Sequence, residues 1–185
     1  MKKAGKKNAY IPRVLMMVLT TVLIGVIVAI MQVVGQIQGT ARVVNYAGLV
    51  RGETQRIIKL ENASLPQDGM IDDVTSFIAG LRFGSKELQL VRLNDVNFQN
   101  KMAELSDEFE MLKKEIQLVR TVGCQQTDII QQSEDFFAIC DEATGLAAAY
   151  SQRRATILSY LENVAAADIV ALVVLIALEL FHALQ

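Results

Sequence analysis

Two long apolar stretches constrain the fold more than any other feature of the chain. The first runs from Val14 to Val34 without a charged side chain, and about 20 such residues are enough for a helix to cross a bilayer. The second covers residues 164–185 and holds Asp168 near its start and Glu179 and His182 near its end. We predict a transmembrane helix for each stretch, with these three side chains at the membrane interfaces or against a partner helix.

The charge before the first stretch predicts the orientation in the membrane. Residues 1–13 hold Lys2, Lys3, Lys6, Lys7 and Arg13 and no acid. By the positive-inside rule this basic tail lies in the cytoplasm, so we place residues 35–163 outside the cytoplasmic (inner) membrane. A secretory signal has a shorter apolar region, which favours an uncleaved anchor. Because the basic cluster flanks a membrane segment, nucleic acid is excluded as a partner.

Residues 35–163 show helical periodicity and no strand alternation. The loop of residues 64–69 separates the first two helices, and Asp68 in it is a candidate helix cap. The expected helices are residues 37–62, residues 71–83, a third through residues 102–119 that ends at Gly123, and a fourth that begins around Thr127–Asp128 and continues into the second apolar stretch. The fold class is therefore all-α: two transmembrane helices that flank an extracytoplasmic antiparallel four-helix bundle.

Apolar residues repeat at intervals of three and four on the last two outer helices, as helix seams do. The third helix carries Met102, Leu105, Phe109, Leu112, Ile116 and Val119. The fourth carries Phe136, Cys140, Ala143, Ala147, Tyr150, Arg154, Ile157, Leu161 and Val164. On one continuous helix Cys124 and Cys140 would lie about 24 Å apart, so we expect two free cysteines.

The first outer helix carries two neighbouring stripes. One is apolar or small and suits the core of the bundle: Val43, Ala47, Val50, Thr54 and Ile57. The other mixes apolar residues with Gly, Arg and Gln: Val44, Gly48, Arg51, Gln55, Ile58 and Asn62. A mixed stripe suits a seam with a second copy of the same helix. We therefore expect a homodimer in which Arg51 of each chain approaches Arg51 of the other.

Two guanidinium groups in one seam repel each other, and neither can lose its proton. Either an acid of the protein or a small planar oxyanion has to offset their charge, and the sequence leaves both open. Gly48, one turn before Arg51, leaves room for an anion. Counting residues from the ends of the two apolar stretches puts Tyr150 level with Arg51, and Gln55 lies one turn beyond it. Both are candidate flanking residues, although Tyr150 also fits as a core residue.

The segment directly after the first apolar stretch contains a family motif. Residues 45–51 read Asn-Tyr-Ala-Gly-Leu-Val-Arg and are followed by Gln-Arg at residues 55–56. This pattern resembles the P-box of nitrate/nitrite sensor kinases of the NarX/NarQ type. It also resembles the N-terminal domain of type IV pili methyl-accepting chemotaxis transducers of the PilJ type. The motif itself covers about a dozen residues. The layout of the segments resembles that family over the whole outer domain.

The resemblance implies a ligand site. It assigns anion binding at the dimer interface to Arg51 and Gly48, with Asn45 and Arg56 as supporting positions. By helix spacing, Arg56 also fits an ordinary surface pair with Glu53. The residue after the motif arginine is often Met in the family and is Gly here, and related domains occur on receptors for other ligands. The motif therefore supports the module more strongly than the ligand.

These observations predict a non-enzymatic sensor. The chain has one His and shows no clustered metal ligands, phosphate loop or nucleophile with a base partner, so we expect no cofactor, no metal and no catalysis within it. The predicted role is ligand detection at the dimer seam and a helix shift across the membrane to a cytoplasmic signalling domain or partner, as in chemotaxis or two-component systems. The alternative is a membrane scaffold or interaction protein with a ligand-free bundle.

Overall fold

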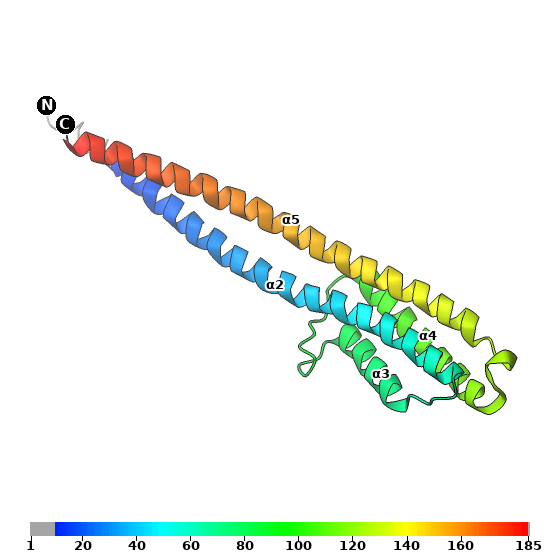
Figure 1. Cartoon of the computed structure of the whole chain (residues 1–185). Coiled ribbons are helices and arrows are strands. Elements are labelled where there is room, and N and C mark those ends of the chain that lie inside the picture. Colours follow the sequence, from blue (N-terminus) through cyan, green and yellow to red (C-terminus); the bar gives the residue numbers. More distant parts are fainter. Residues whose placement is uncertain (1–9, 185) are drawn as a thin grey trace. The chain divides into compact units, whose positions relative to one another are not determined.

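A computed structural model describes residues 10–184 of the chain (Figure 1). Its elements are α2 (Tyr10–Asn62), α3 (Asp68–Phe83), α4 (Val96–Val122), the 3-10 turn η1 (Cys124–Gln126) and α5 (Ile129–Leu184). Between residues 10 and 184 the only β-type pairing is an isolated bridge of Ser85 with Leu90. The all-α prediction is thereby confirmed. Most of the basic tail falls on residues 1–9, which lie outside the described residues.

The chain divides into two units. One comprises residues 37–153, and the other combines residues 1–36 with residues 154–185. Helices α2 and α5 each supply a segment to both units. By length and composition, both helices are able to cross a membrane.

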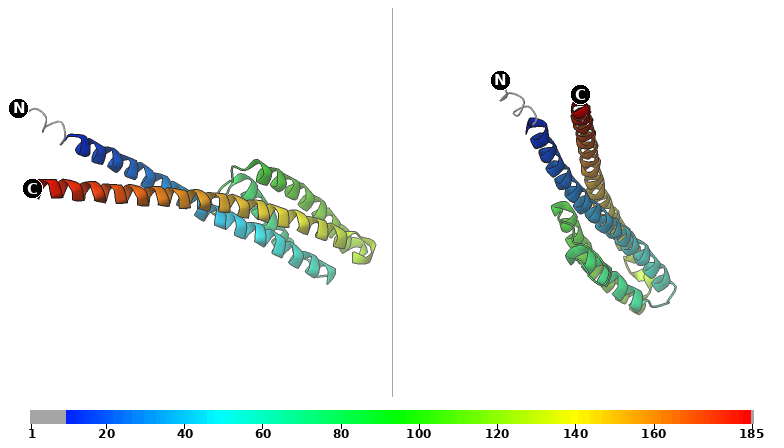
Figure 2. Two further views of the ribbon diagram at one scale, coloured as in Figure 1. Left: turned by 90° about the horizontal axis from the view of Figure 1, so that it is seen from above. Right: turned by 90° about the vertical axis from the view of Figure 1, so that its left-hand side faces the viewer.

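Segments of all four helices lie together in the unit of residues 37–153 (Figure 2), and one apolar core joins them. Every residue of the predicted stripe on residues 102–119 is buried, and so is the predicted core stripe of α2 that begins at Val43. Two aromatic pairs link neighbouring helices, with ring centroids 5.1 Å apart for Tyr46 and Phe77 and 5.5 Å apart for Phe109 and Phe136. The 3-4 spacing alone therefore identified the core-facing sides of α2 and α4.

A core substitution measures how much this packing contributes. Phe136 is 1% exposed, and Phe136→Ala is expected to lower the free energy of unfolding by about 3–5 kcal/mol. The neighbouring Phe137 is 37% exposed, so Phe137→Ala is a matched control with an expected loss of about 1 kcal/mol. Urea unfolding in detergent micelles, followed by circular dichroism, measures both. Equal losses would contradict the packing described here.

Glu61, a buried acid of the core unit, is the centre of a hydrogen-bond network at one end. The carboxylate of Glu61 has a side chain only 1% exposed. It accepts hydrogen bonds from Arg120 Nε at 2.9 Å and Nη2 at 2.5 Å, and from the backbone N–H of Gln67 at 2.9 Å. Arg120 Nη1 donates to Asp68 Oδ1 at 2.8 Å. These hydrogen bonds raise the pKa of Arg120, with Glu61 as the largest cause, and they tie α2, α3 and α4 together.

The start of α3 differs from the sequence prediction, and the start of the fourth helix agrees with it within one residue. Asp68 is the first residue of α3 rather than its cap, and Gln67 at the cap position makes no side-chain cap hydrogen bond. The Asp68 carboxylate contacts Arg120 instead, since a charged partner is a stronger attraction than a backbone N–H. The fourth helix begins at Ile129, after the turn η1, which helical periodicity does not predict because it is a single short turn.

The stripe predicted for α5 is wrong at two of its three positions beyond Arg154, because Ile157 and Val164 are 42% and 50% exposed. The less exposed residues of this segment include the predicted Leu161, and the others are Leu158, Ala165, Asp168, Ala171, Leu172, Leu175 and Glu179. A strict seven-residue repeat drifts around a helix with 3.6 residues per turn, so the inward stripe advances by one residue. Asp168 consequently becomes 7% exposed, and among the described residues its Oδ2 has no hydrogen-bond partner.

Candidate functional site: the Arg51 surface of α2

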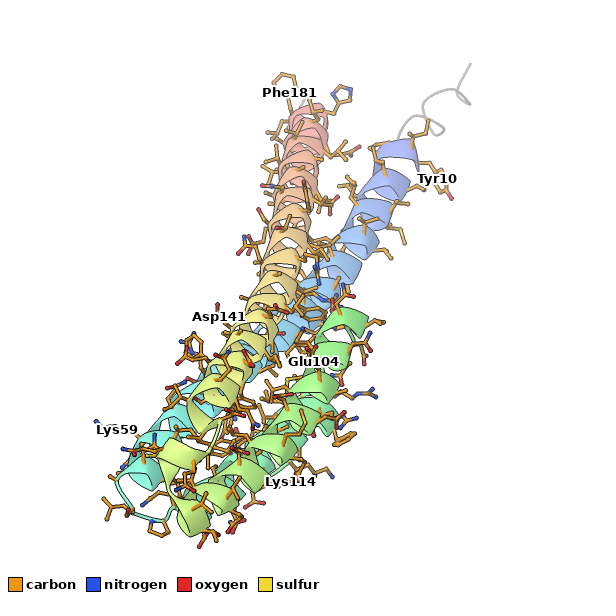
Figure 3. The ribbon with its side chains drawn as sticks, turned by 90° about the vertical axis from the view of Figure 1, so that its right-hand side faces the viewer. Tyr10, Lys59, Glu104, Lys114, Asp141 and Phe181 are labelled. Carbon is orange, nitrogen blue, oxygen red and sulfur yellow. The ribbon has the colours of Figure 1, made fainter. Side chains whose placement is uncertain are left out.

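Arg51 on α2 makes two contacts with α5. Its Nη1 donates a hydrogen bond to Asp141 Oδ1 at 2.7 Å, and its Cζ lies 5.3 Å from the ring centroid of Phe137. Phe137 and Asp141 are four residues apart and thus lie on the same face of α5, where Figure 3 labels Asp141. Asp141 attracts the guanidinium by its charge and Phe137 by its aromatic ring.

The ion pair is accessible to solvent. The side chains of Arg51 and Asp141 are 38% and 65% exposed, and exposed pairs contribute about 0–1 kcal/mol. A guanidinium has five N–H donors, and the pair with Asp141 uses Nη1. Within one chain, then, a protein acid meets the charge of Arg51, but it does so weakly and on an exposed surface.

Gly48 leaves open space one turn before Arg51. A Cβ added at Gly48 would have no neighbouring atom within 4 Å. The predicted seam residues Val44, Gly48, Arg51, Gln55 and Asn62 are all half-buried. Ile58, predicted for the same seam, is 5% exposed and belongs to the core of the chain itself. Ile58 is therefore a core residue and not part of the predicted seam.

The other predicted positions lie away from the contacts of Arg51. Asn45 is exposed on α2. Arg56 lies 3.9 Å from Glu53, between Nη1 and Oε2, and its side chain is 65% exposed. Among the described residues, the structure brings Arg51 together with α5 and not with either of these side chains.

Tyr150 is not level with Arg51, contrary to the height argument. The contacts of Arg51 are with Phe137 and Asp141, and Tyr150 follows Asp141 by nine residues, about 14 Å along a helix. Tyr150 packs against the core, and the Arg153 guanidinium lies 5.9 Å from its ring centroid. Tyr150 would be level with Arg51 if the two apolar stretches began at the same height. The pairing of Arg51 with Asp141 differs from that register by more than two turns of α5.

Cys140 lies beneath this surface as a buried free thiol, and Cys124 is free as well. Burial is the main cause that raises the pKa of Cys140 to about 12, with the Asp141 charge adding to the shift and the Arg51 charge opposing it. An unfolded thiol ionises near pH 8.5. The contribution of Cys140 to stability is therefore complete below that pH and decreases as pH rises toward 12.

Thiol labelling tests this difference between the cysteines. At pH 8 we expect a maleimide to modify the half-buried Cys124 and to leave Cys140 unmodified until the chain is unfolded, because the reactive thiolate is absent and the sulfur is covered. Mass spectrometry of the Cys124→Ser and Cys140→Ser variants assigns the labels. Rapid labelling of Cys140 in the folded chain would contradict the burial of the thiol.

The structure was compared with known proteins. Neither the comparison with protein-family models nor that with curated proteins gave a match. The ligand binding domain of the P. aeruginosa nitrate receptor McpN is similar in structure, with a TM-score of 0.53 and 16% sequence identity, over 60% of this chain and 96% of that domain. Among residues 10–184 no group of three or more His, Cys, Asp or Glu could hold a metal ion. The likeness shows that the matched 60% of the chain has the fold of this ligand-binding domain.

Proposed function

We propose that the chain is the sensory and membrane-anchoring part of a transmembrane signalling receptor. Its unit of residues 37–153 is an extracytoplasmic antiparallel four-helix bundle that binds a small planar oxyanion of the nitrate type. The observation that carries this proposal is the half-exposed guanidinium of Arg51 beside the open space at Gly48. The fold shared with the ligand binding domain of a nitrate receptor supports it.

The site is completed in a homodimer with a two-fold axis along the α2 seam. Each chain brings one Arg51 and one Asp141 to the axis, so the four charges balance in the absence of ligand. An oxyanion binds a guanidinium edge through two parallel hydrogen bonds. It competes with the Asp141 carboxylate for Arg51, and binding therefore changes the contact between α2 and α5.

That contact is well placed to control signalling. Helices α2 and α5 each continue without interruption from the unit of residues 37–153 into an apolar stretch. When the anion takes over Arg51, the attraction that holds α2 against α5 at Asp141 is lost, and small helix shifts of this kind switch receptors. The two spans transmit the shift to a cytoplasmic signalling domain or partner.

A titration with anions tests the proposal. The full chain in lipid nanodiscs is titrated by calorimetry with nitrate, nitrite, chloride, sulfate and acetate. We expect saturable binding of nitrate or nitrite and weaker binding of chloride, which has no pair of oxygens to accept two parallel hydrogen bonds from the guanidinium edge. Absence of binding across the whole panel contradicts the proposal.

The role of Asp141 gives a second prediction. Asp141→Asn is expected to increase the affinity for the anion about fivefold, because it removes a negative charge some 5 Å from the ligand, worth about 1 kcal/mol near water. Asp135→Asn is a matched control on the same helix, where Asp135 Oδ1 accepts a hydrogen bond from Gln131. The same titration measures both variants. Weaker binding in Asp141→Asn would show that Asp141 positions Arg51 and does not compete with the anion.

One observation favours a second candidate, a membrane scaffold that binds no small molecule. In the structure a protein acid, Asp141, already meets the charge of Arg51, as the scaffold requires. In that case Arg51 and Asp141 act only on stability. Neither the original chain nor Asp141→Asn then gives binding heat with any anion of the panel.

A further inference from the structure

The connection between α3 and α4, residues 84–95, lies at the end of the unit of residues 37–153 where the chain enters and leaves (Figure 1). A Cβ added at Gly39, near the start of the unit, would lie 2.8 Å from Val91 Cγ2, so the connection packs directly on α2. Asp95 Oδ2 accepts a hydrogen bond from Arg153 Nη2, at the end of the unit, at 2.6 Å.

The connection is built as a defined structure and not as a loose loop. Leu90 and Leu93 are 5% and 3% exposed and belong to the core. Ser85 and Leu90 exchange backbone hydrogen bonds of 3.0 and 2.8 Å. Buried leucines of this kind fix the position of the residues around them.

Three large apolar side chains around this connection face solvent nevertheless. Phe83 is 67% exposed, Val91 46% and Val96 75%. Phe83 ends α3 and Val96 begins α4, so both border the connection. None of the three belongs to the buried core, although Val91 also packs on Gly39 of α2. Exposed apolar groups gathered at one end of a domain indicate a contact surface.

The charge around these residues is basic. Arg82, Lys86 and Arg92 lie within the same segment, whose one exposed acid is Glu87, since Asp95 is half-buried and paired with Arg153. Residues 63–73, at the opposite end of the unit, contain three aspartates and no basic residue, and Arg120 of α4 pairs with one of them, Asp68. Basic and apolar side chains together fit an anionic lipid surface.

The distance to the membrane agrees with this assignment. Gly39 follows Val34, the end of the first apolar stretch, by five residues, about 8 Å along a helix. The head-group layer extends about 5–7 Å beyond the hydrocarbon core on each side. On α5, Tyr160 is 69% exposed and follows Arg153 by seven residues, and tyrosine is enriched at membrane–water boundaries. The connection thus packs on a residue of α2 that closely follows the first apolar stretch in sequence.

We propose that residues 83–96 dock on the head-group layer of an anionic bilayer, with Phe83 and Val96 inserted and Lys86 and Arg92 against lipid phosphates. This proposal rests on the membrane crossing in the proposed function. The docked surface holds the α3–α4 end of the bundle at the membrane, against which α2 and α5 shift.

Single tryptophans test the docking, because the chain contains none of its own. Phe83→Trp and Val96→Trp are compared in nanodiscs of anionic lipid with acyl chains brominated near the head group. Leu65→Trp is the control far from the connection. Leu65 lies in the acidic segment of residues 63–73 and is 53% exposed. Ile24→Trp, in the middle of the first apolar stretch and 59% exposed, reports the membrane crossing itself. It is measured in nanodiscs with acyl chains brominated near their free ends, because the middle of the hydrocarbon core lies about 15 Å from the head groups.

We expect the loss of fluorescence at Phe83→Trp and Val96→Trp to be about twofold or more the loss at Leu65→Trp, as interfacial insertion implies. When Lys86→Glu and Arg92→Glu are added to the Val96→Trp chain, we expect its fluorescence loss to fall to that of Leu65→Trp. Quenching equal to that of Leu65→Trp, while Ile24→Trp is quenched, overturns the docking alone. A blue-shifted emission without quenching also overturns it, because protein then covers the surface. No quenching at Ile24→Trp overturns the membrane crossing, and the docking with it.

Discussion

Replacing Arg51 with alanine is expected to lower the affinity for a small planar oxyanion by about 100-fold or more. Two charge-assisted hydrogen bonds are lost, each contributing about 1.5–3 kcal/mol. Arg51→Lys keeps the charge but loses the planar fork that matches an oxyanion, and we expect its affinity to lie between those of the original chain and Arg51→Ala. Calorimetric titration of the full chains in nanodiscs measures all three.

A control separates this effect from a general change in charge. Arg42 is exposed on the same helix and donates a hydrogen bond to Gln89 rather than to the Arg51 surface. Arg42→Ala should therefore bind the anion within about twofold of the original chain, the level of a screened distant charge. An equal loss in both variants would show that the anion responds to the overall charge of α2 and not to a site at Arg51.

Breaking the network of Glu61 and Arg120 is expected to give the largest loss of stability outside the apolar core. Arg120→Met leaves the Glu61 carboxylate, whose side chain is 1% exposed, buried without its partner. Removing one member of a buried ion pair costs about 3–5 kcal/mol. Urea unfolding of the chain in detergent micelles measures the loss, and the effect on anion affinity should be small because the network lies at another part of the unit.

The double variant Glu61→Leu with Arg120→Met distinguishes the buried charge from lost packing. Replacing both partners by apolar residues of similar size is often neutral or stabilising, so we expect it to recover most of the loss. Lys113→Met, which removes a surface pair with Glu110 at 2.6 Å, should cost under about 1 kcal/mol. A loss in Arg120→Met no greater than that in Lys113→Met would contradict the described role of the network.

The sequence predicted the helices and the buried faces of α2 and α4 because local spacing alone determines them. The core stripe that begins at Val43 and the stripe through Phe109 follow directly from the 3-4 repeat. Beyond Arg154 the same repeat failed on α5, because both neighbouring stripes of an all-apolar segment satisfy it. In such a segment only the packing partner decides which face turns inward.

The partners of Arg51 could not be predicted, since periodicity does not set the relative height of two helices. Phe137 directly follows the core residue Phe136, and Asp141 directly follows the core residue Cys140. This position beside the core stripe was the available indication that both residues border a neighbouring helix. Which residue of α2 they meet depends on the register between α2 and α5. The apolar stretches predicted that register wrongly by more than two turns.

The most direct test of an anion site at Arg51 is the nuclear magnetic resonance signal of its own guanidinium. The full chain, labelled with nitrogen-15 at arginine, is titrated with nitrate in nanodiscs, and the loss of one signal in Arg51→Lys assigns the Nε–H of Arg51. A saturable shift of that signal, with the signals of Arg42 and Arg120 unchanged, is the predicted result. Saturable calorimetric binding of nitrate without a shift at Arg51, or no arginine shift at any nitrate concentration, would contradict the proposed site.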